Sequence, residues 1–183
     1  MPKIILGLAA ELAGGKGTVA KHIIEKYDGS AHRFSTMLRD VLDRLYLDQN
    51  RENMQKLSTI TRKAYGEDTL AKVISEDVKK DDHEVIVVDG VRRSADIKYL
   101  KELPEFKLIY IEADIEKRFE RIKERGENPD DKSKTFEDFK KDHEGEADIR
   151  IRDLKKHADY IIDNNKDINY LHSQIDDVVS KYK

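Results

Sequence analysis

The chain has 183 residues, of which 38% are hydrophobic and 40% are charged, with a formal net charge of -3. This length suits one domain with a buried core, and the small net charge argues against a general nucleic-acid or membrane-surface binder. The sequence holds no cysteine, which excludes a disulfide framework and a thiolate metal site. The apolar run near the N-terminus is too short to span a membrane, so we expect a cytoplasmic protein.

Apolar periodicity predicts strands that alternate with helices along the chain. In chain order we expect a strand over 3–8, a helix over 17–27, a strand over 31–34, helices over 36–46, 51–65 and 68–80, a strand over 84–88, a helix capped by Ser94, a strand over 106–111, a helix over 115–125, and a strand over 160–162 before a terminal helix. This order predicts a three-layer α/β fold, in which helices cover both faces of a five-stranded, mostly parallel sheet. Ligands of such sheets bind at the carboxyl ends of the strands, so the segments that follow strands are the candidate sites.

The segment 10–18, Ala-Glu-Leu-Ala-Gly-Gly-Lys-Gly-Thr, follows the first predicted strand and leads into a helix. Glycines allow successive backbone N–H groups to turn around phosphate oxygens, and the helix N-terminus and Lys16 add positive charge. The residues expected to bind the phosphates of ATP are Ala13, Gly14, Gly15, Lys16, Gly17 and Thr18. The alternative is a tight turn with a surface lysine. Glu11 is unusual beside a triphosphate, and we expect its side chain to point outward.

A second motif, Val-Asp-Gly-Val-Arg-Arg over 88–93, closes the third predicted strand. Asp89 can hold the hydration shell of Mg²⁺, and Arg92 or Arg93 can grip the phosphate of an acceptor through its planar guanidinium. Taken alone, an acidic residue after a strand is as often a turn former.

A third motif is a stripe of arginines on the helix predicted over 115–125. Arg118, Arg121 and Arg125 are spaced i, i+3 and i+7, so they share one side of that helix. A neighbouring apolar stripe anchors the helix to the core. We expect the arginines to line a cleft; the alternative is a solvated face paired with neighbouring glutamates.

Several segments resemble those of adenylate kinases. The Gly-Lys-Gly-Thr order is similar to theirs, and it puts the Mg²⁺-binding hydroxyl on Thr18. Phe-Ser-Thr-Met-Leu-Arg over 34–39 resembles their acceptor-binding segment, and 88–94 resembles their Asp-Gly-Phe-Pro-Arg-Thr stretch. The similarity is closer to adenylate-kinase-related proteins of poorly assigned activity, through Arg-x-x-Tyr-Gly over 62–66 and through 118–121 and 158–164.

The resemblance to P-loop nucleoside monophosphate kinases implies an ATP- and Mg²⁺-dependent phosphotransferase that acts on a nucleoside or deoxynucleoside monophosphate. It implies an acceptor-binding helical region over 36–80 and a short lid over 126–134. The implied roles are acceptor binding by Ser35, Arg39, Arg62 and Arg92 or Arg93, metal binding by Thr18 and Asp89, catalysis by Lys16, Arg92, Arg118, Arg121 and Arg125, and adenine packing at Asn164.

Two alternatives stay open. The first is a kinase of the same fold that phosphorylates dephospho-coenzyme A, and the second is a nucleotide-binding regulatory module with little turnover. Each would bind small-molecule nucleotides, and we expect a monomer or a small homo-oligomer with no nucleic-acid or membrane partner.

Overall fold

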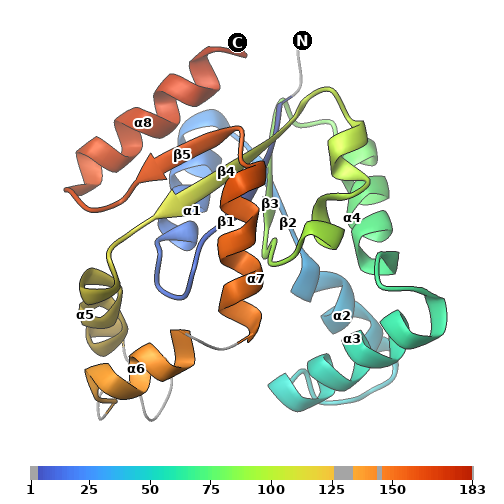
Figure 1. The fold of residues 1–183 in the computed structure, drawn as a ribbon. Coiled ribbons are helices and arrows are strands. Elements are labelled where there is room, and N and C mark those ends of the chain that lie inside the picture. The colour runs from blue at the N-terminus through green and yellow to red at the C-terminus, as the bar shows by residue number, and fades with distance from the viewer. Residues whose placement is uncertain (1–3, 126–133, 144–145, 183) are drawn as a thin grey trace.

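The computed structural model describes residues 4–125, 134–143 and 146–182 (Figure 1). Its centre is a five-stranded sheet with the strand order β2-β3-β1-β4-β5. The strands are β1 (Ile4–Ala9), β2 (Ser30–Arg33), β3 (Val85–Asp89), β4 (Phe106–Glu112) and β5 (Tyr160–Asp163). Every neighbouring pair in the sheet is parallel. The expectation of a mostly parallel α/β sheet is therefore confirmed, and all four strand pairs of the described residues are parallel.

The helices of the described residues match the periodicity in the first half of the chain better than in the second. They are α1 (Lys16–Tyr27), α2 (Phe34–Arg44), α3 (Arg51–Tyr65), α4 (Thr69–Lys80), α5 (Ile115–Arg125), α6 (Phe136–His143), α7 (Glu146–Leu154) and α8 (Ile168–Ser180). The helix expected after Ser94 is instead two short 3₁₀ turns, η1 (Ser94–Ile97) and η2 (Leu100–Glu102), and a third turn, η3 (Lys155–His157), follows α7. The periodicity did not predict α6 and α7.

Alternating residues of the central strand β1 pack into two separate hydrophobic cores. Ile4, Leu6 and Leu8 face the core under α1 and α8, whereas Ile5 and Ala9 face the core under α4, η1 and α7. Both cores are almost fully buried, and each buried Ile or Leu side chain stabilises the fold by about 1.5–3 kcal/mol. Burial on both faces explains why β1 is a continuous apolar run rather than an alternating one.

The strand register brings the predicted motifs to one edge of the sheet. Asp89 at the end of β3 is the register partner of Leu8 in β1 and of Arg33 in β2. The segment after β1 and the segment after β3 therefore begin side by side. The α2–α3 pair and the α5–α6 pair form two arms at this end of the molecule, with α7 between them (Figure 1).

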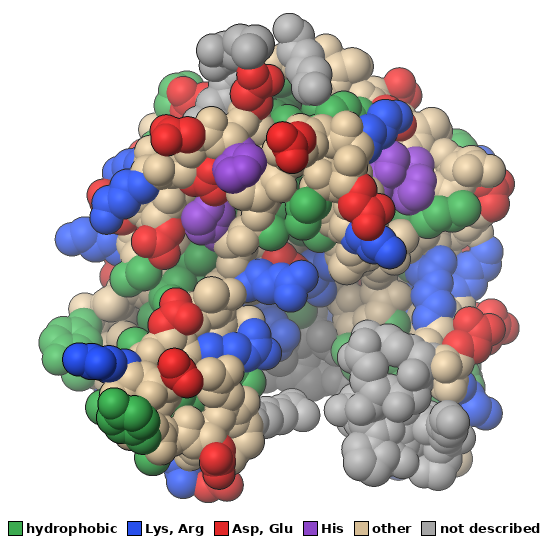
Figure 2. Space-filling view, turned by 180° about the vertical axis from the view of Figure 1, so that it is seen from behind, with side chains coloured by type: hydrophobic (Ala, Val, Ile, Leu, Met, Phe, Trp, Pro, Cys, Tyr) green, Lys and Arg blue, Asp and Glu red, His purple; other side chains and the backbone are tan. Residues whose placement is uncertain are grey.

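Seen from behind, the molecule is hollowed between these two arms, and Lys and Arg side chains gather above the hollow (Figure 2). Within the part of the chain that the structure describes, no helix has the length and apolar character needed to cross a membrane.

Candidate functional site

The segment after β1 is wound into a tight loop, which we call the phosphate loop (residues 10–15). The Gly14 N–H donates to the Glu11 carbonyl at 2.9 Å, and Ala13 and Gly15 have positive φ angles of 58° and 103°. A Cβ atom at Gly15 would overlap the side-chain nitrogen of Asn164. Glycine is therefore required at Gly15 for two reasons, its left-handed backbone and the close approach of Asn164.

The phosphate loop leads directly into the N-terminus of α1. Gly15 is the N-cap of α1, no side chain caps the helix, and its first turn carries no acidic residue among the described residues. Lys16 starts the helix, and its Nζ lies 3.4 Å from the Ala10 carbonyl, folded back over the loop. The N–H groups of a first helical turn have no partners within the helix and carry positive partial charge. This arrangement fits a polyphosphate, with Thr18 exposed on the same turn.

Asn164, the residue that follows β5, holds the backbone of the phosphate loop in place. It is 6% exposed, and its side-chain nitrogen donates to the Gly14 carbonyl at 2.9 Å. Arg121 of α5 donates to the Asn164 carbonyl at 2.9 Å. The structure thus connects Asn164 and Arg121 to the loop backbone, and a contact of Asn164 with adenine stays a prediction.

The expectation that Glu11 points outward is wrong. Its carboxylate is 15% exposed and lies 3.3 Å from the guanidinium of Arg118 and 3.8 Å from that of Arg152. Arg118 is itself only 2% exposed, and it also donates to the carbonyls of Ala113 (3.1 Å) and Leu12 (3.4 Å). A buried guanidinium needs a carboxylate and several acceptors nearby, and Glu11 supplies that carboxylate.

Arg118 consequently lies behind the phosphate loop and supports its backbone, whereas the sequence pattern suggested a position along a cleft. The same region is closed to water at Tyr110, where burial, with a contribution from the Glu11 carboxylate, raises the pKa of the phenol to about 12. The side chain of Arg125 and most of the expected lid (126–133) lie outside the described residues, so their roles stay predictions.

Asp89 lies beside Leu8, two residues before the phosphate loop, and is paired with Arg33 at 3.4 Å. Its Oδ1 is buried and has no hydrogen-bond partner within the described residues. Mg²⁺ in proteins keeps several waters and takes only one or two protein oxygens besides substrate phosphates. The free oxygen of Asp89 and the exposed hydroxyl of Thr18 suit such an ion. The described residues contain no group of three or more His, Cys, Asp or Glu that could hold a metal by themselves.

The arginines expected to bind the acceptor fall into two groups. Arg39 donates to the Ser35 hydroxyl at 3.1 Å one turn earlier on α2, so these two residues form a pair. Arg62 and Arg93 meet at Asp96, where each guanidinium lies 3.7 Å from the same carboxylate oxygen, Oδ1. The structure therefore brings Arg62 and Arg93 together across 31 positions of sequence.

Asp96 was not predicted from the sequence, although it organises this second group. It is 3% exposed, and its Oδ2 accepts the backbone N–H groups of Arg92 (3.0 Å) and Arg93 (3.1 Å). This contact fixes the turn after β3, so that the Arg93 side chain is half-buried and that of Arg92 is exposed. The only signal in the sequence is an acidic residue three positions after Arg93, which is the spacing of a helix start.

Comparison with known proteins agrees with this geometry. A family profile described as an AAA domain matches residues 13–140. A UPF0200 protein of Staphylothermus marinus is 30% identical over 166 residues, which cover 91% of this chain and 86% of the relative. The chain belongs to the UPF0200 family and carries this AAA domain. A second UPF0200 protein, from Hyperthermus butylicus, is 24% identical over 174 residues, covering 95% of this chain and 92% of the relative.

Solved structures are similar to this UPF0200 chain in fold alone. A protein of Thermus thermophilus named TT1252 has a TM-score of 0.64 at 14% identity, with both chains covered in full. The shikimate kinase of Bacteroides thetaiotaomicron has a TM-score of 0.59 at 13% identity, with 97% of each chain covered. Their fold confirms the expectation of a three-layer P-loop kinase fold.

Proposed function

We propose that this UPF0200 chain is an ATP-dependent phosphotransferase whose acceptor is a small phosphorylated molecule, a nucleoside or deoxynucleoside monophosphate. One observation supports this most directly: a helix N-terminus suited to a polyphosphate and a group of arginines suited to a second anion lie at the same edge of one sheet. The first follows β1 and the second follows β3, which are paired in register at Leu8 and Asp89. A phosphotransferase needs two such anion sites close together.

On the donor side, the phosphate loop from Ala13 to Gly15 and the first turn of α1 would surround the ATP phosphates with backbone N–H groups. Lys16 would reach the outer phosphates, where its charge opposes the negative charge that develops during transfer. Thr18 and Asp89 would hold Mg²⁺ and its waters. When bound, Mg²⁺ would neutralise charge on the phosphate oxygens.

On the acceptor side, Arg39, oriented by Ser35, and Arg92 or Arg93, helped by Arg62, would hold the acceptor phosphate. Transfer onto a phosphate oxygen needs no general base, so positioning and charge neutralisation are the work that these side chains must do. Arg121 and Arg125 would stabilise charge on the transferred group, and Arg118 would act by holding the loop in shape.

The proposal is tested by incubating the protein with ATP, Mg²⁺ and each of a panel of acceptors while following ADP formation. The panel holds the ribo- and deoxyribonucleoside monophosphates and dephospho-coenzyme A. We expect turnover with at least one monophosphate, and a fall in kcat on the order of a hundredfold or more in Lys16→Ala, with an unchanged circular dichroism spectrum.

Each other outcome has a definite meaning. Turnover with dephospho-coenzyme A alone would assign the alternative acceptor. ATP binding without transfer to any acceptor would make the regulatory module the better interpretation. Near-normal turnover of Lys16→Ala would show that the phosphate loop does not serve catalysis.

A further inference from the structure

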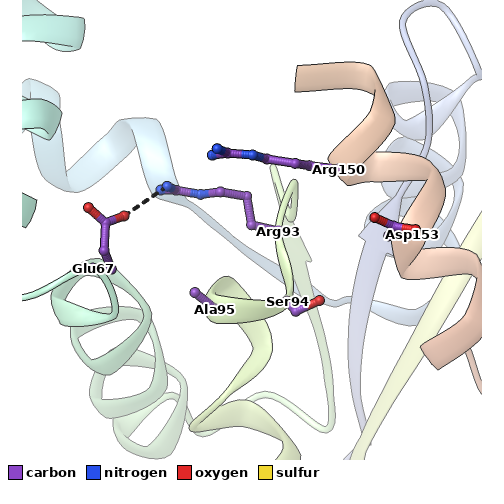
Figure 3. A pocket seen from close by; sticks show the side chains of 6 residues that line it. All are labelled: Glu67, Arg93, Ser94, Ala95, Arg150 and Asp153. Carbon is purple, nitrogen blue, oxygen red and sulfur yellow. Dashed lines mark hydrogen bonds and ion pairs between the residues drawn. The ribbon is translucent and has the colours of Figure 1, made fainter. Parts of the chain in front are cut away.

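A pocket of about 300 Å³ opens beside the turn that follows β3 (Figure 3). Its walls come from three parts of the chain, namely the loop before α4, the start of η1 and the helix α7. The residues that line it are Glu67, Arg93, Ser94, Ala95, Arg150 and Asp153. The pocket is large enough for a small polar molecule. Arg150 and Asp153 belong to α7, the helix that the sequence pattern did not predict.

Two arginines from different elements line this pocket. Arg93 extends from the turn after β3, and Arg150 extends beside it from α7 in the same direction (Figure 3). Arg93 is held in place by Glu67 at 3.1 Å and by the buried carboxylate of Asp96. A guanidinium fixed in this way is pre-organised for a bidentate contact with an oxyanion.

The guanidinium of Arg93 is more buried than the carboxylates of the pocket. The side chains of Arg93 and of its neighbour Arg62 are 23% and 12% exposed, whereas that of Glu67 is 69% exposed, and Arg150 is exposed. Asp153 is 56% exposed and is paired with Lys156. Exposed carboxylates are well hydrated and weakly coupled to their partners. Burial lowers the pKa of the Arg62 guanidinium and the Arg93 cation lowers it further, which is the effect expected where cations crowd together.

The helix α7 also reaches the phosphate loop. Arg152, two residues after Arg150, lies 3.8 Å from the Glu11 carboxylate. Residues two apart on a helix point in different directions, so α7 sends one arginine to the phosphate loop and the other to the pocket. The pocket is therefore a neighbour of the proposed donor site, joined to it by a single helix.

We propose that Arg93 and Arg150 together bind the phosphate of the acceptor in this pocket, and that Glu67 and Asp153 accept hydrogen bonds from amino or hydroxyl groups on the rest of that molecule. The ligand class is a phosphate monoester that carries hydrogen-bond donors. The identification of this ligand as the acceptor rests on the proposed function, and the binding site itself does not. Arg150 is a substrate-binding residue in this assignment, and Arg92 is not required.

The test measures binding by calorimetry without ATP, using adenosine, cytidine, guanosine and uridine 5′-monophosphates, the free nucleosides and inorganic phosphate. The variants are Arg93→Ala, Arg150→Ala, Arg150→Lys, Asp153→Asn and, as a control, Lys101→Ala, an exposed lysine of η2. We expect each Arg→Ala change to weaken binding of the preferred monophosphate about tenfold, and Arg150→Lys to restore only part of it.

The different ligands distinguish contacts with the phosphate from contacts with the rest of the molecule. Inorganic phosphate should depend on Arg93 and Arg150 but not on Asp153, whereas the monophosphate should depend on all three. All variants should bind ATP as tightly as the parent does. Lys101→Ala should also bind the monophosphate as tightly as the parent does. Monophosphate binding that is unchanged in Arg150→Ala, or absent from the parent, would overturn the assignment. The assignment would also be overturned if Arg93→Ala and Arg150→Ala weakened the binding of free nucleosides as much as that of monophosphates.

Activity assays on the same variants keep the two proposals distinct. If a monophosphate is phosphorylated but its KM and Kd do not change in Arg93→Ala and Arg150→Ala, the pocket is wrong and the phosphotransferase function stands. If Arg150-dependent binding is found without any transfer, the site stands and the proposed function fails.

Discussion

The Arg118 guanidinium of α5 lies 3.3 Å from the Glu11 carboxylate, which pairs a buried cation with an acid inside the phosphate loop. The two residues are 107 positions apart in sequence. Because Arg118 also donates to the Leu12 carbonyl, the pair fixes both the backbone and a side chain of the loop. An acid beside a phosphate site would weaken anion binding if it were free to face the ligand, and pairing with two arginines removes that effect.

Removing either partner of the Arg118–Glu11 pair should lower the stability of the fold. Arg118→Met removes the nearer guanidinium from Glu11, and Glu11→Leu removes the Glu11 carboxylate from the buried Arg118. We expect each single variant to lower the free energy of unfolding by about 3 kcal/mol, measured by urea denaturation, and the double variant to lose less than the sum. Strictly additive losses would show that the two side chains do not act as a pair.

Gly15→Ala should damage the phosphate loop. A residue with a Cβ is strained at the φ angle of 103°, and that Cβ would overlap Asn164. We expect a loss of about 1–3 kcal/mol in the free energy of unfolding, and weaker ATP binding by calorimetry. The matched control is Gly17→Ala, where a Cβ meets no atom within 4 Å, so that the free energy of unfolding should not fall. Equal losses at both positions would contradict the strain argument.

Arg39→Ala should act on the acceptor and not on ATP. Arg39 is half-buried and oriented by the Ser35 hydroxyl at 3.1 Å. We expect a loss on the order of 2 kcal/mol in kcat/KM for the acceptor, with the KM for ATP nearly unchanged. Ser35→Ala, which only removes the orienting contact, should show a smaller change in the same direction. A change in the KM for ATP alone would place Arg39 on the donor side.

Arg121→Ala separates an enzyme from a binding module. The Nη2 of Arg121 donates to the Asn164 carbonyl, and its Nη1 is buried with no hydrogen-bond partner within the described residues. If Nη1 contacts the transferred phosphoryl group, kcat should fall about a hundredfold while the Kd for ATP changes much less. Arg121→Lys should rescue poorly because it lacks the planar guanidinium. Equal effects on kcat and Kd would indicate a role in positioning the loop only.

A pH dependence of stability is expected at the contact between α1 and α8. Burial alone would raise the pKa of Asp176, but hydrogen bonds from Lys26, Tyr27 and His22 outweigh it and lower the pKa to about 2. Because the folded pKa lies below the ordinary value of 3.8, this stabilisation is complete above pH 4 and is lost as the pH falls toward 2.

The variant Asp176→Asn should therefore have a free energy of unfolding roughly 1–2 kcal/mol below that of the parent at pH 7. This value allows for partial hydration of the carboxylate. At pH 2.5 the difference between the two proteins should be smaller. Urea denaturation at the two pH values measures it, and Asp177→Asn, an exposed neighbour, is the control. A difference that is the same at both pH values would contradict the assignment to Asp176.

Local patterns in the sequence are enough to predict most of the sheet and the phosphate loop. The strands β1, β3 and β4 are apolar runs because both faces of the sheet are covered there, and the turn after β1 needs glycine at Gly15 because of its left-handed backbone. The helix α7 was not predicted because, among its residues whose burial the structure describes, Ile151 and Leu154 lie in the core and the residues beside them are charged. The helix α6 is short, with eight residues, and buries Phe139. Neither helix repeats an apolar face often enough to be recognised.

Only the tertiary structure decided which charges meet. The sequence by itself determined that Glu11, Arg118 and Arg93 exist beside the expected motifs, but the partners of each lie on other elements. Arg118 turns out to hold Glu11, and Arg93 meets Arg62 at Asp96 and lies beside Arg150 in one pocket. Helical periodicity predicts which side of a helix a residue is on, but not what packs against that side. Pairing over tens of residues depends on how the sheet orders its strands, and that order is a property of the whole fold.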